Sequence, residues 1–349
     1  MSPMTTITSV LIWRNYDVKA YKGFDKDLKC RDFQFEEGKT YKEKKAKLCE
    51  CGFHACLNPF DVLQFYPIFD SVYHEVELSS IQRKSLTRAN SQFAENTKIC
   101  GKQITIGKEL SVLDLCEAAE LFIFNYIEKY KNYYKLENRN VGEWNNYNIN
   151  NRGDIVYNDT IIICLEDSGK KLDHARIDTA YLTSPVNCVK ILNSRNRANI
   201  SACGNNVQII NKASCAISVS GSNNIIYNTD FKTRVTSSGL RTTIINGMDA
   251  PNTNISVSGE MSNILDYGNS SNISCSARNC HIKVFGKNSN VVCSGEDCIV
   301  SGSIGTLITL TGRDKDNKLI ATSFKIDGND YKENTPYIFE DGSIVEHFN

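Results

Sequence analysis

A five-residue motif recurs through the second half of this chain, and it restricts the fold more than any other feature. The motif reads "ISACG" from 200, "ISVSG" from 217, "VTSSG" from 235, "ISVSG" from 255, "ISCSA" from 273 and "VVCSG" from 291. Successive copies start about 18 residues apart, and a second apolar residue falls about midway between them. The repeating step is therefore a half-coil of about nine residues.

Each copy of the motif alternates between two faces, as a β-strand does. One of these faces carries a small residue at the third position of every copy: Ala202, Val219, Ser237, Val257, Cys275 and Cys293. Gly, Asn and Ser at the ends of the copies supply the backbone conformations of tight corners. The pattern predicts a parallel β-solenoid over residues 145–312, with about 18 residues per coil and two flattened sides. Three hexapeptide sides per coil are the alternative.

The segments around the solenoid predict three further parts. Residues 111–138 have apolar positions at helical spacing after a candidate N-cap, Ser111, and predict a long helix that connects the parts or caps the open end of the solenoid. Residues 313–349 contain three strand-like runs with Asp341-Gly342 as a hairpin turn, and predict a β cap. Residues 1–110 mix strand and helix signals, beginning with a strand-like run at 9–13. The predicted fold class is thus an α+β N-terminal domain joined by a long helix to a parallel β-solenoid with a C-terminal β cap.

The balance of positive and negative residues argues against a nucleic-acid partner. Lys plus Arg and Asp plus Glu both number 40, so the chain has no formal net charge. A protein that neutralises nucleic-acid phosphates needs an excess of cations, so we expect no nucleic-acid partner. No run reaches the roughly 18 apolar residues of a membrane span, and no export signal is evident, so we expect a cytoplasmic protein without a membrane partner. In a reducing compartment, most of the 14 cysteines are expected to be packed thiols.

Residues 49–67, "CECGFHACLNPFDVLQFYP", are the most informative stretch of the front part. Asn58 is a preferred N-cap residue, and Pro59 suits the first position of a helix because its missing N–H needs no partner there. Pro67 marks the end of the helical segment. We therefore expect "GFHA" to be a strand or loop that leads into a helix of about one and a half turns.

The same stretch raises the question of a metal site. Cys49, Cys51, His54 and Cys56 form a C-x-C-x2-H-x-C cluster, to which Cys30 could add a ligand. Structural zinc sites usually combine two C-x2-C knuckles from separate segments, and this cluster lacks that spacing. We expect packed cysteines, one functional or structural histidine and no metal. A Cys–His nucleophile pair ranks lower still, because nothing marks its orienting third group.

Five stretches of the chain resemble a family of uncharacterised phage and bacterial proteins. They are "AYKGFDKDLKCRDFQFEEGKTY" (20–41), "LCECGFHACLNPFDVLQFYP" (48–67), "YHEVEL" (73–78), "ITIGKEL" (104–110) and "FKIDGNDYKENTPYIFEDGSIVE" (324–346). Members of that family typically combine such a front domain with a small-residue β-solenoid. The resemblance implies a phage or prophage protein, but it implies no activity.

The order of motifs in the front domain also resembles compact ADP-ribosyltransferases such as the rifampin-modifying enzymes. In that resemblance "YKGF" stands for the first-strand motif, and "GFHA" leads into the helix. It implies an NAD site in which Tyr21, Lys22 and Gly23 line the nicotinamide pocket, while Tyr41 or His54 stacks on the ring. Lys22 departs from the pattern, since those enzymes have histidine there, and this puts the contacts to the ribose in doubt.

The catalytic residues implied by this resemblance lie on the "YHEVEL" segment. Glu75 or Glu77 would be the acidic partner that stabilises positive charge on the sugar as nicotinamide leaves. His54 is the further catalytic candidate, since histidine titrates near neutral pH. The ordinary alternative is that both glutamates form the exposed side of a strand.

Three functions stay open from the sequence. The first is a non-catalytic phage-type protein, in which a rigid solenoid serves recognition or assembly and a front domain is mounted on it. The second is an ADP-ribosyltransferase-like enzyme that uses NAD. The third is a module that binds or sequesters a nucleotide. The expected partner is accordingly a protein or a small molecule such as a nucleotide, and a homo-oligomer formed through the solenoid is an open alternative.

Overall fold

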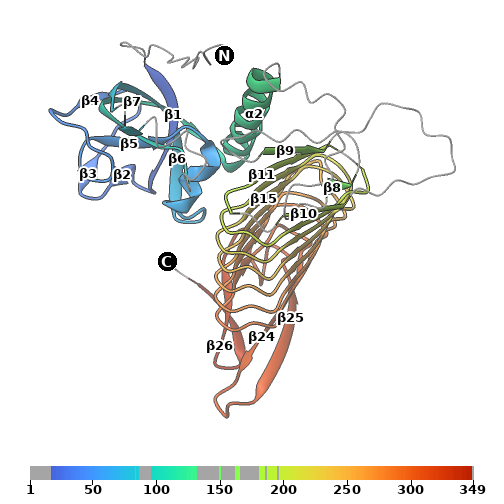
Figure 1. Cartoon of the computed structure of the whole chain (residues 1–349). Helices are drawn as coiled ribbons and strands as arrows, with labels where there is room; N and C mark the ends of the chain where they lie inside the picture. The colour runs from blue at the N-terminus through green and yellow to red at the C-terminus, as the bar shows by residue number, and fades with distance from the viewer. Residues whose placement is uncertain are drawn as a thin grey trace. The chain divides into compact units, whose positions relative to one another are not determined.

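The computed structural model describes residues 17–82, 84–85, 96–131, 149–150, 162–165, 181–184, 187–194 and 196–347 (Figure 1). Contacts divide the chain into two compact units, with the boundary at Val112 and Leu113. The first unit is the front domain, and the second contains the solenoid. The predicted strand at 9–13 lies outside the described residues.

The front domain is a small, antiparallel β structure. Its elements are β1 (Val18–Asp25), β2 (Lys29–Cys30), β3 (Phe33–Gln34), β4 (Thr40–Lys42), β5 (Phe53–Cys56), η1 (Pro59–Gln64), β6 (Ser71–Ile81) and β7 (Lys98–Leu110). The main sheet has the order β4-β7-β5-β1-β6, and β6 also pairs with β7. This last pairing closes β1, β5, β7 and β6 into a ring, in which β1 and β5 are joined through Tyr21 and Cys56.

The described residues of the predicted α+β front domain form a small β domain, in which strands dominate and helical residues are limited to η1 and to 84–85. Asn58 caps the segment after β5 as expected, and its side chain accepts a hydrogen bond from the backbone N–H of Phe60. However, the segment is a 3₁₀ helix that ends at Gln64. Asp61 holds this short turn, since its carboxylate accepts hydrogen bonds from the backbone N–H and hydroxyl of Thr97, at 2.6 and 2.7 Å. Short helical pieces of this kind are commonly 3₁₀.

The second unit contains the predicted parallel β-solenoid, with about seven turns of about 18 residues over 190–310. Its strands alternate between two ten-stranded sheets. The first sheet contains β8 (Ile149–Asn150), β10 (Tyr181–Ser184), β12 (Asn199–Ala202), β14 (Ala216–Val219), β16 (Arg234–Ser237), β18 (Asn254–Val257), β20 (Asn272–Cys275), β22 (Asn290–Cys293), β24 (Leu307–Arg313) and β25 (Leu319–Lys325). The second contains β9 (Ile162–Leu165), β11 (Lys190–Asn193), β13 (Gln208–Asn211), β15 (Ile225–Asn228), β17 (Thr243–Asn246), β19 (Asn263–Asp266), β21 (His281–Val284), β23 (Ile299–Ser301), β26 (Tyr337–Glu340) and β27 (Ser343–Glu346).

Parallel pairing brings equivalent positions of successive coils into columns. Ile217 pairs with Val235, and Val235 pairs with Ile255, and all three side chains are buried. The six small third-position residues also form one column, as the sequence predicts, and are buried in the interior. The half-coil step is visible in the backbone as well. A residue with positive φ recurs about every nine residues, for example at Met261, Ser270 and Asn279.

Glycine is required where the corners of successive coils approach each other closely. A Cβ atom on Gly259 would lie 2.0 Å from the carbonyl oxygen of Gly239, which no side chain tolerates. The same approach recurs one coil earlier, where a Cβ atom on Gly239 would lie 2.0 Å from the carbonyl oxygen of Gly221. A larger residue at these corners would therefore force neighbouring coils apart.

The helix α2 (Val112–Lys131) forms within the predicted range 111–138, and residues 132–138 lie outside the described residues. Leu115, Cys116, Ala119 and Ile123 form its buried stripe. From Leu113 onward the helix belongs to the same compact unit as the solenoid. A role for α2 in joining the two units stays a prediction.

Contacts of α2 place it beside the outer face of the second sheet. Glu120 forms an ion pair with Lys212, which follows β13. Burial raises the pKa of Tyr227, and Cys116 and the nearby carboxylates add to this increase. All four residues of β13, β15 and β17, which belong to the second sheet, are buried. In β18 and β20, which belong to the first sheet, exposed and buried residues alternate. A sheet covered on both faces has this burial pattern.

Three antiparallel strands follow the last coil, as the tail of the sequence predicts. Strand β25 pairs along β24, and β26 pairs with β23 at Val300 and Tyr337. Asp341 and Gly342 both have positive φ and form the tight turn between β26 and β27. These strands cover the edges that the last coil would otherwise expose.

A chain of buried amides runs along one interior corner of the solenoid. Asn193, Asn211, Asn228 and Asn246 each donate from Nδ2 to the next residue of the column, at 2.6, 2.6, 2.7 and 2.7 Å. The last acceptor is Asp266. A carboxylate has no donor when ionised, so the chain of amides ends there. The column then continues with Val284.

Asn228→Ala tests this column. We expect the free energy of unfolding to fall by about 2–4 kcal/mol, because the amide of Asn211 loses its acceptor and the carbonyl of Asn246 loses its donor inside the protein. Asn272→Ala is the matched control, since its amide is exposed on a strand of the other sheet. Urea denaturation of both variants makes the measurement, and equal effects would contradict the role of the column.

Asp266→Asn tests the end of the column. Burial raises the pKa of Asp266 to about 6, so the folded protein binds its proton more tightly than the unfolded chain does. This carboxyl therefore favours folding most at acid pH, and that contribution is lost as pH rises through about 6. We expect Asp266→Asn to be more stable than the parent at pH 7.5 by on the order of 2 kcal/mol, with a difference that shrinks towards pH 4. A difference independent of pH would contradict this assignment.

Candidate functional site: a basic, aromatic cavity

The front domain contains a cavity of about 750 Å³. This volume is typical of small-molecule sites. Its aromatic lining consists of Tyr21, Phe33, Phe35, Phe53, Phe65 and Tyr66. The basic residues at the cavity are Lys22, Arg31 and Lys98, and the acidic ones are Glu43 and Glu50.

Strand β1 brings Tyr21, Lys22 and Gly23 to the cavity, so the "YKGF" motif does lie at a candidate site. Gly23 has a specific packing role. A Cβ atom at this position would lie 2.4 Å from the ring of Tyr66, so the ring can rest on the strand only because the residue is glycine. The motif therefore positions Tyr66, which follows η1 in the sequence.

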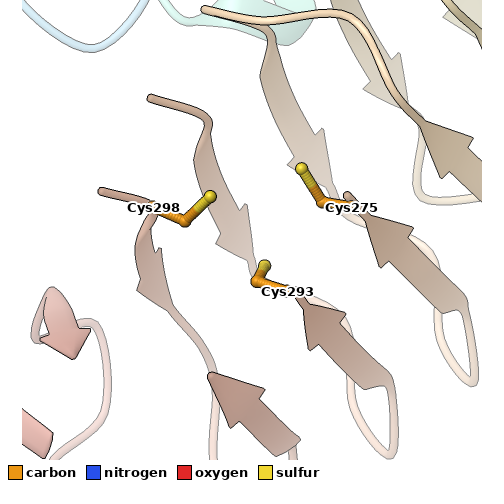
Figure 2. Close-up of side chains that lie close together, drawn as sticks. All are labelled: Cys275, Cys293 and Cys298. Carbon is orange, nitrogen blue, oxygen red and sulfur yellow. The ribbon is translucent and has the colours of Figure 1, made fainter. Parts of the chain in front are cut away.

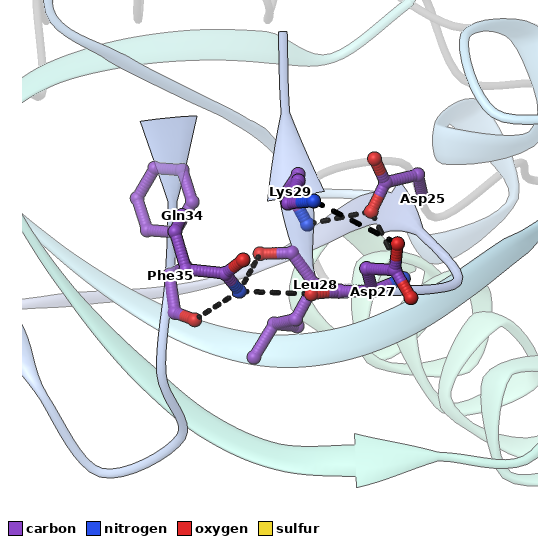
Figure 3. Close-up of polar contacts among 6 residues, drawn as sticks. All are labelled: Asp25, Asp27, Leu28, Lys29, Gln34 and Phe35. Atoms are coloured by element: carbon purple, nitrogen blue, oxygen red, sulfur yellow. Dashed lines mark hydrogen bonds and ion pairs between the residues drawn. The ribbon is translucent and has the colours of Figure 1, made fainter. Parts of the chain in front are cut away.

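The segment after β1, which contains the paired strands β2 and β3, carries Cys30, Arg31 and Phe33 to the cavity, and polar contacts hold it in shape (Figure 3). A carboxylate oxygen of Asp25 accepts hydrogen bonds from the backbone N–H groups of residues 27 and 29, at 3.0 and 2.7 Å. The side-chain amide of Gln34 donates to the carbonyl oxygens of residues 27 and 35, at 2.8 and 2.9 Å. The lining residues are thus carried by an ordered loop.

Lys22 is the most unusual group of the cavity, because this lysine is only 7% exposed. Its ammonium lies 3.6 Å from Cys30 Sγ and 3.5 Å from Tyr66 Oη, and these two atoms are 3.1 Å apart. Among the described residues, no carboxylate forms a salt bridge with Lys22. Burial lowers the pKa of this lysine, and Lys98 acts in the same direction. A buried cation at a cavity without a carboxylate partner is suited to an anionic ligand.

His54 also lines the cavity, but its ring is hydrogen-bonded to the backbone of the loop that precedes it. The backbone N–H of Cys49 donates to Nε2 at 2.9 Å, and the ring has a further hydrogen bond with the backbone of Gly52. Burial lowers the pKa of His54, and Lys98 and Lys22 lower it further. The histidine is therefore favoured in its neutral form and orders the loop. Its predicted catalytic and stacking roles stay predictions.

Lys98 and Arg31 add positive charge to the cavity. Lys98 Nζ lies 4.0 Å from the centre of the Phe65 ring, which is a cation–π distance. Arg31 has a φ of 56° in the loop after β2. Together with Lys22 they give the cavity three cations against the carboxylates of Glu43 and Glu50.

Three of the predicted site residues lie away from the cavity lining. Tyr41 packs against the rings of Phe33 and Phe35, at centroid distances of 5.4 and 5.1 Å. Glu75 forms an ion pair with Lys19 at 2.7 Å, and Glu77 is exposed on the same strand. The structure therefore does not bring these residues together with Lys22, and their NAD-binding and catalytic roles stay predictions.

Sequence reasoning missed Cys30, Arg31, Tyr66 and Lys98. Cys30 was considered only as a metal ligand, and Tyr66 was treated as part of a helix. Their signal is weak because they come from separate segments that only the closed sheet brings together. Within the described residues, the single group of three metal-ligand side chains that gathers closely lies in the solenoid and not in the 49–56 cluster.

These features define a two-part protein, with a β-solenoid scaffold and a small β domain that carries a basic, aromatic cavity. Residues 18–118 match a domain of unknown function, DUF7666, and this range includes every residue that lines the cavity. No curated protein and no solved structure matches the chain. None of the helices in the described part of the chain is long and apolar enough to cross a membrane.

Lys22→Met tests the burial of the ammonium. The lowered pKa means that the unfolded chain binds this proton more tightly, so the charge opposes folding below the folded-state pKa. This penalty is lost as pH rises towards the usual value of 10.5. We expect Lys22→Met to raise the free energy of unfolding at pH 7, with a smaller gain near pH 10. Lys19→Met, on an exposed position of the same strand, is the control in urea denaturation. A loss of stability at pH 7 would contradict the prediction.

Proposed function

We propose that the front domain binds a negatively charged small molecule with a planar ring, which is the chemistry of a nucleotide. The buried ammonium of Lys22 at the cavity is the observation that carries this proposal. An anionic group placed beside it would supply the negative partner that the described residues do not provide.

The aromatic lining supports the second half of the proposal. Phe33, Phe53 and Phe65 offer ring faces on which a base can stack, and base–aromatic stacking contributes about 1–3 kcal/mol per base. Arg31 and Lys98 supply further positive charge for a phosphate. A single nucleotide fits a cavity of about 750 Å³.

Binding is favoured over ADP-ribosyl transfer by the placement of the carboxylates. Glu75 is paired with Lys19, and neither Glu75 nor Glu77 lines the cavity. NAD remains one candidate ligand, because it combines phosphates with two planar rings. The enzymatic alternative predicts that NAD is consumed with release of nicotinamide.

The solenoid is proposed to be the rigid scaffold of the two-part protein. Its continuous parallel pairing and its capped end support a stiff, non-aggregating rod. A phage or prophage origin, a role in recognition or assembly, and self-association through the solenoid are parts of this proposal that rest on the sequence resemblance and on the fold class.

Calorimetric titration of the full chain with AMP, ATP, NAD, adenosine and inorganic phosphate tests the proposed function. We expect nucleotides to bind more tightly than adenosine or phosphate alone, because only they engage both the cations and the rings. Lys22→Met should weaken nucleotide binding by about 10- to 100-fold, since a charged hydrogen bond contributes roughly 1.5–3 kcal/mol.

Lys19→Met is the matched control and should bind as the parent does, since its side chain is exposed. Equal binding of nucleotide by the parent and Lys22→Met would overturn the proposed site, and so would indifference to every nucleotide. Nicotinamide release from NAD that Glu75→Gln or Glu77→Gln abolishes would instead establish the enzymatic alternative.

A further inference from the structure

Four cysteines gather in one interior corner of the solenoid, where two neighbouring coils meet. Cys275 and Cys280 belong to one coil, and Cys293 and Cys298 occupy the equivalent positions of the next. In sequence they form a C-x4-C-x12-C-x4-C pattern. All four side chains are buried.

The two positions of each pair face each other across the corner. The corresponding pair of an earlier coil is Ser237 and Thr242, whose side-chain oxygens lie 2.9 Å apart. At these two positions, other coils have Ser184 and Val189, Ala202 and Val207, Val219 and Asn224, or Val257 and Ser262. Only the two coils that adjoin each other along the stack have cysteine at both positions. The corner positions hold other residue types in the other coils, so the packing of the corner does not by itself require four cysteines.

The sulfur atoms are close enough to share one ion. Those of Cys275, Cys293 and Cys298 all lie within 4.8 Å of one another (Figure 2). Cys280 is the fourth cysteine of the corner, at the position that faces Cys275 in the same coil, but its sulfur is not among the three that gather within this distance. Four sulfurs held about 2.3 Å from a tetrahedral zinc ion would lie roughly 3.8 Å apart. The sulfurs of Cys275, Cys293 and Cys298 are therefore near the required spacing.

Backbone carbonyl groups accept hydrogen bonds from these side chains in their thiol form. Cys275 Sγ donates to the carbonyl oxygen of Ala277, and Cys280 Sγ donates to that of Arg278, both at 3.6 Å. In the thiol form, Cys298 Sγ donates to the carbonyl oxygen of Ala277 at 3.2 Å.

We propose that Cys275, Cys280, Cys293 and Cys298 bind one structural zinc ion that links two coils of the solenoid. Zinc is the metal that tetrahedral, closed sites of four thiolates most often hold. Binding releases the thiol protons, and the ion joins residues of neighbouring coils. This inference is independent of the ligand proposed for the front domain.

The metal content of the full chain tests the proposal. Protein produced with zinc in the medium and purified under reducing conditions should contain one equivalent of zinc per chain, measured by mass spectrometry of the metal. The fourfold variant Cys275→Val/Cys280→Ser/Cys293→Val/Cys298→Ser should contain none. It places in both coils the residues that the preceding coil has at Val257 and Ser262, so the solenoid should still form. Cys203→Ser removes an exposed thiol and should retain the zinc.

A second measurement does not depend on the variant folding. The parent chain produced with cobalt in place of zinc should show the intense thiolate-to-cobalt charge-transfer bands and the visible bands of a tetrahedral site. Reduced parent protein that carries neither metal, with all four thiols free to alkylation after unfolding, would overturn the proposal. Zinc that remains in the fourfold variant would overturn it too, because the metal would then lie elsewhere.

Discussion

The parallel pairing of each coil with the next is the constraint on which the solenoid depends. Pairing in register turns every interior position into a column, so a side chain is surrounded by its own equivalents in the coils on either side. A column is stable only when its members suit one another. Apolar residues pack, glycines allow close approach, and amides form a chain because each has both a donor and an acceptor.

In two columns, residues that differ from their equivalents in other coils introduce a carboxylate or a group of thiols. Asp266 ends the amide chain, because a carboxylate accepts from Asn246 and cannot pass a hydrogen bond on. Cysteine at both positions of one corner in adjoining coils brings three sulfurs within 4.8 Å of one another, with a fourth cysteine at the same corner. Matching columns also form on the outer face of the second sheet. Tyr227 and its neighbours in the column are apolar, and the sheet is buried on both faces at this place.

The front domain follows a different principle, in which a closed ring of strands holds one buried cation at a cavity. Sequence patterns were sufficient for strands β1, β6 and β7 and for the capping role of Asn58. They were insufficient for the surroundings of Lys22, because Cys30 comes from the short strand β2 and Tyr66 from the residues after the 3₁₀ helix. In the solenoid, the sequence predicts the column of Cys275 and Cys293. It does not predict the contact with Cys280 and Cys298, because that contact depends on how the chain turns at the corner between two strands.

The sequence by itself determined the solenoid, since a half-coil of about nine residues with alternating apolar positions has few other ways to bury them. It also determined the three strands of the tail. Only the tertiary structure decided that the front domain is a closed β structure, that α2 lies with the solenoid, and which side chains meet at the cavity and at the cysteine corner. Periodic order is local and repeats in the sequence, whereas a site depends on contacts between segments whose separation in the chain follows no pattern.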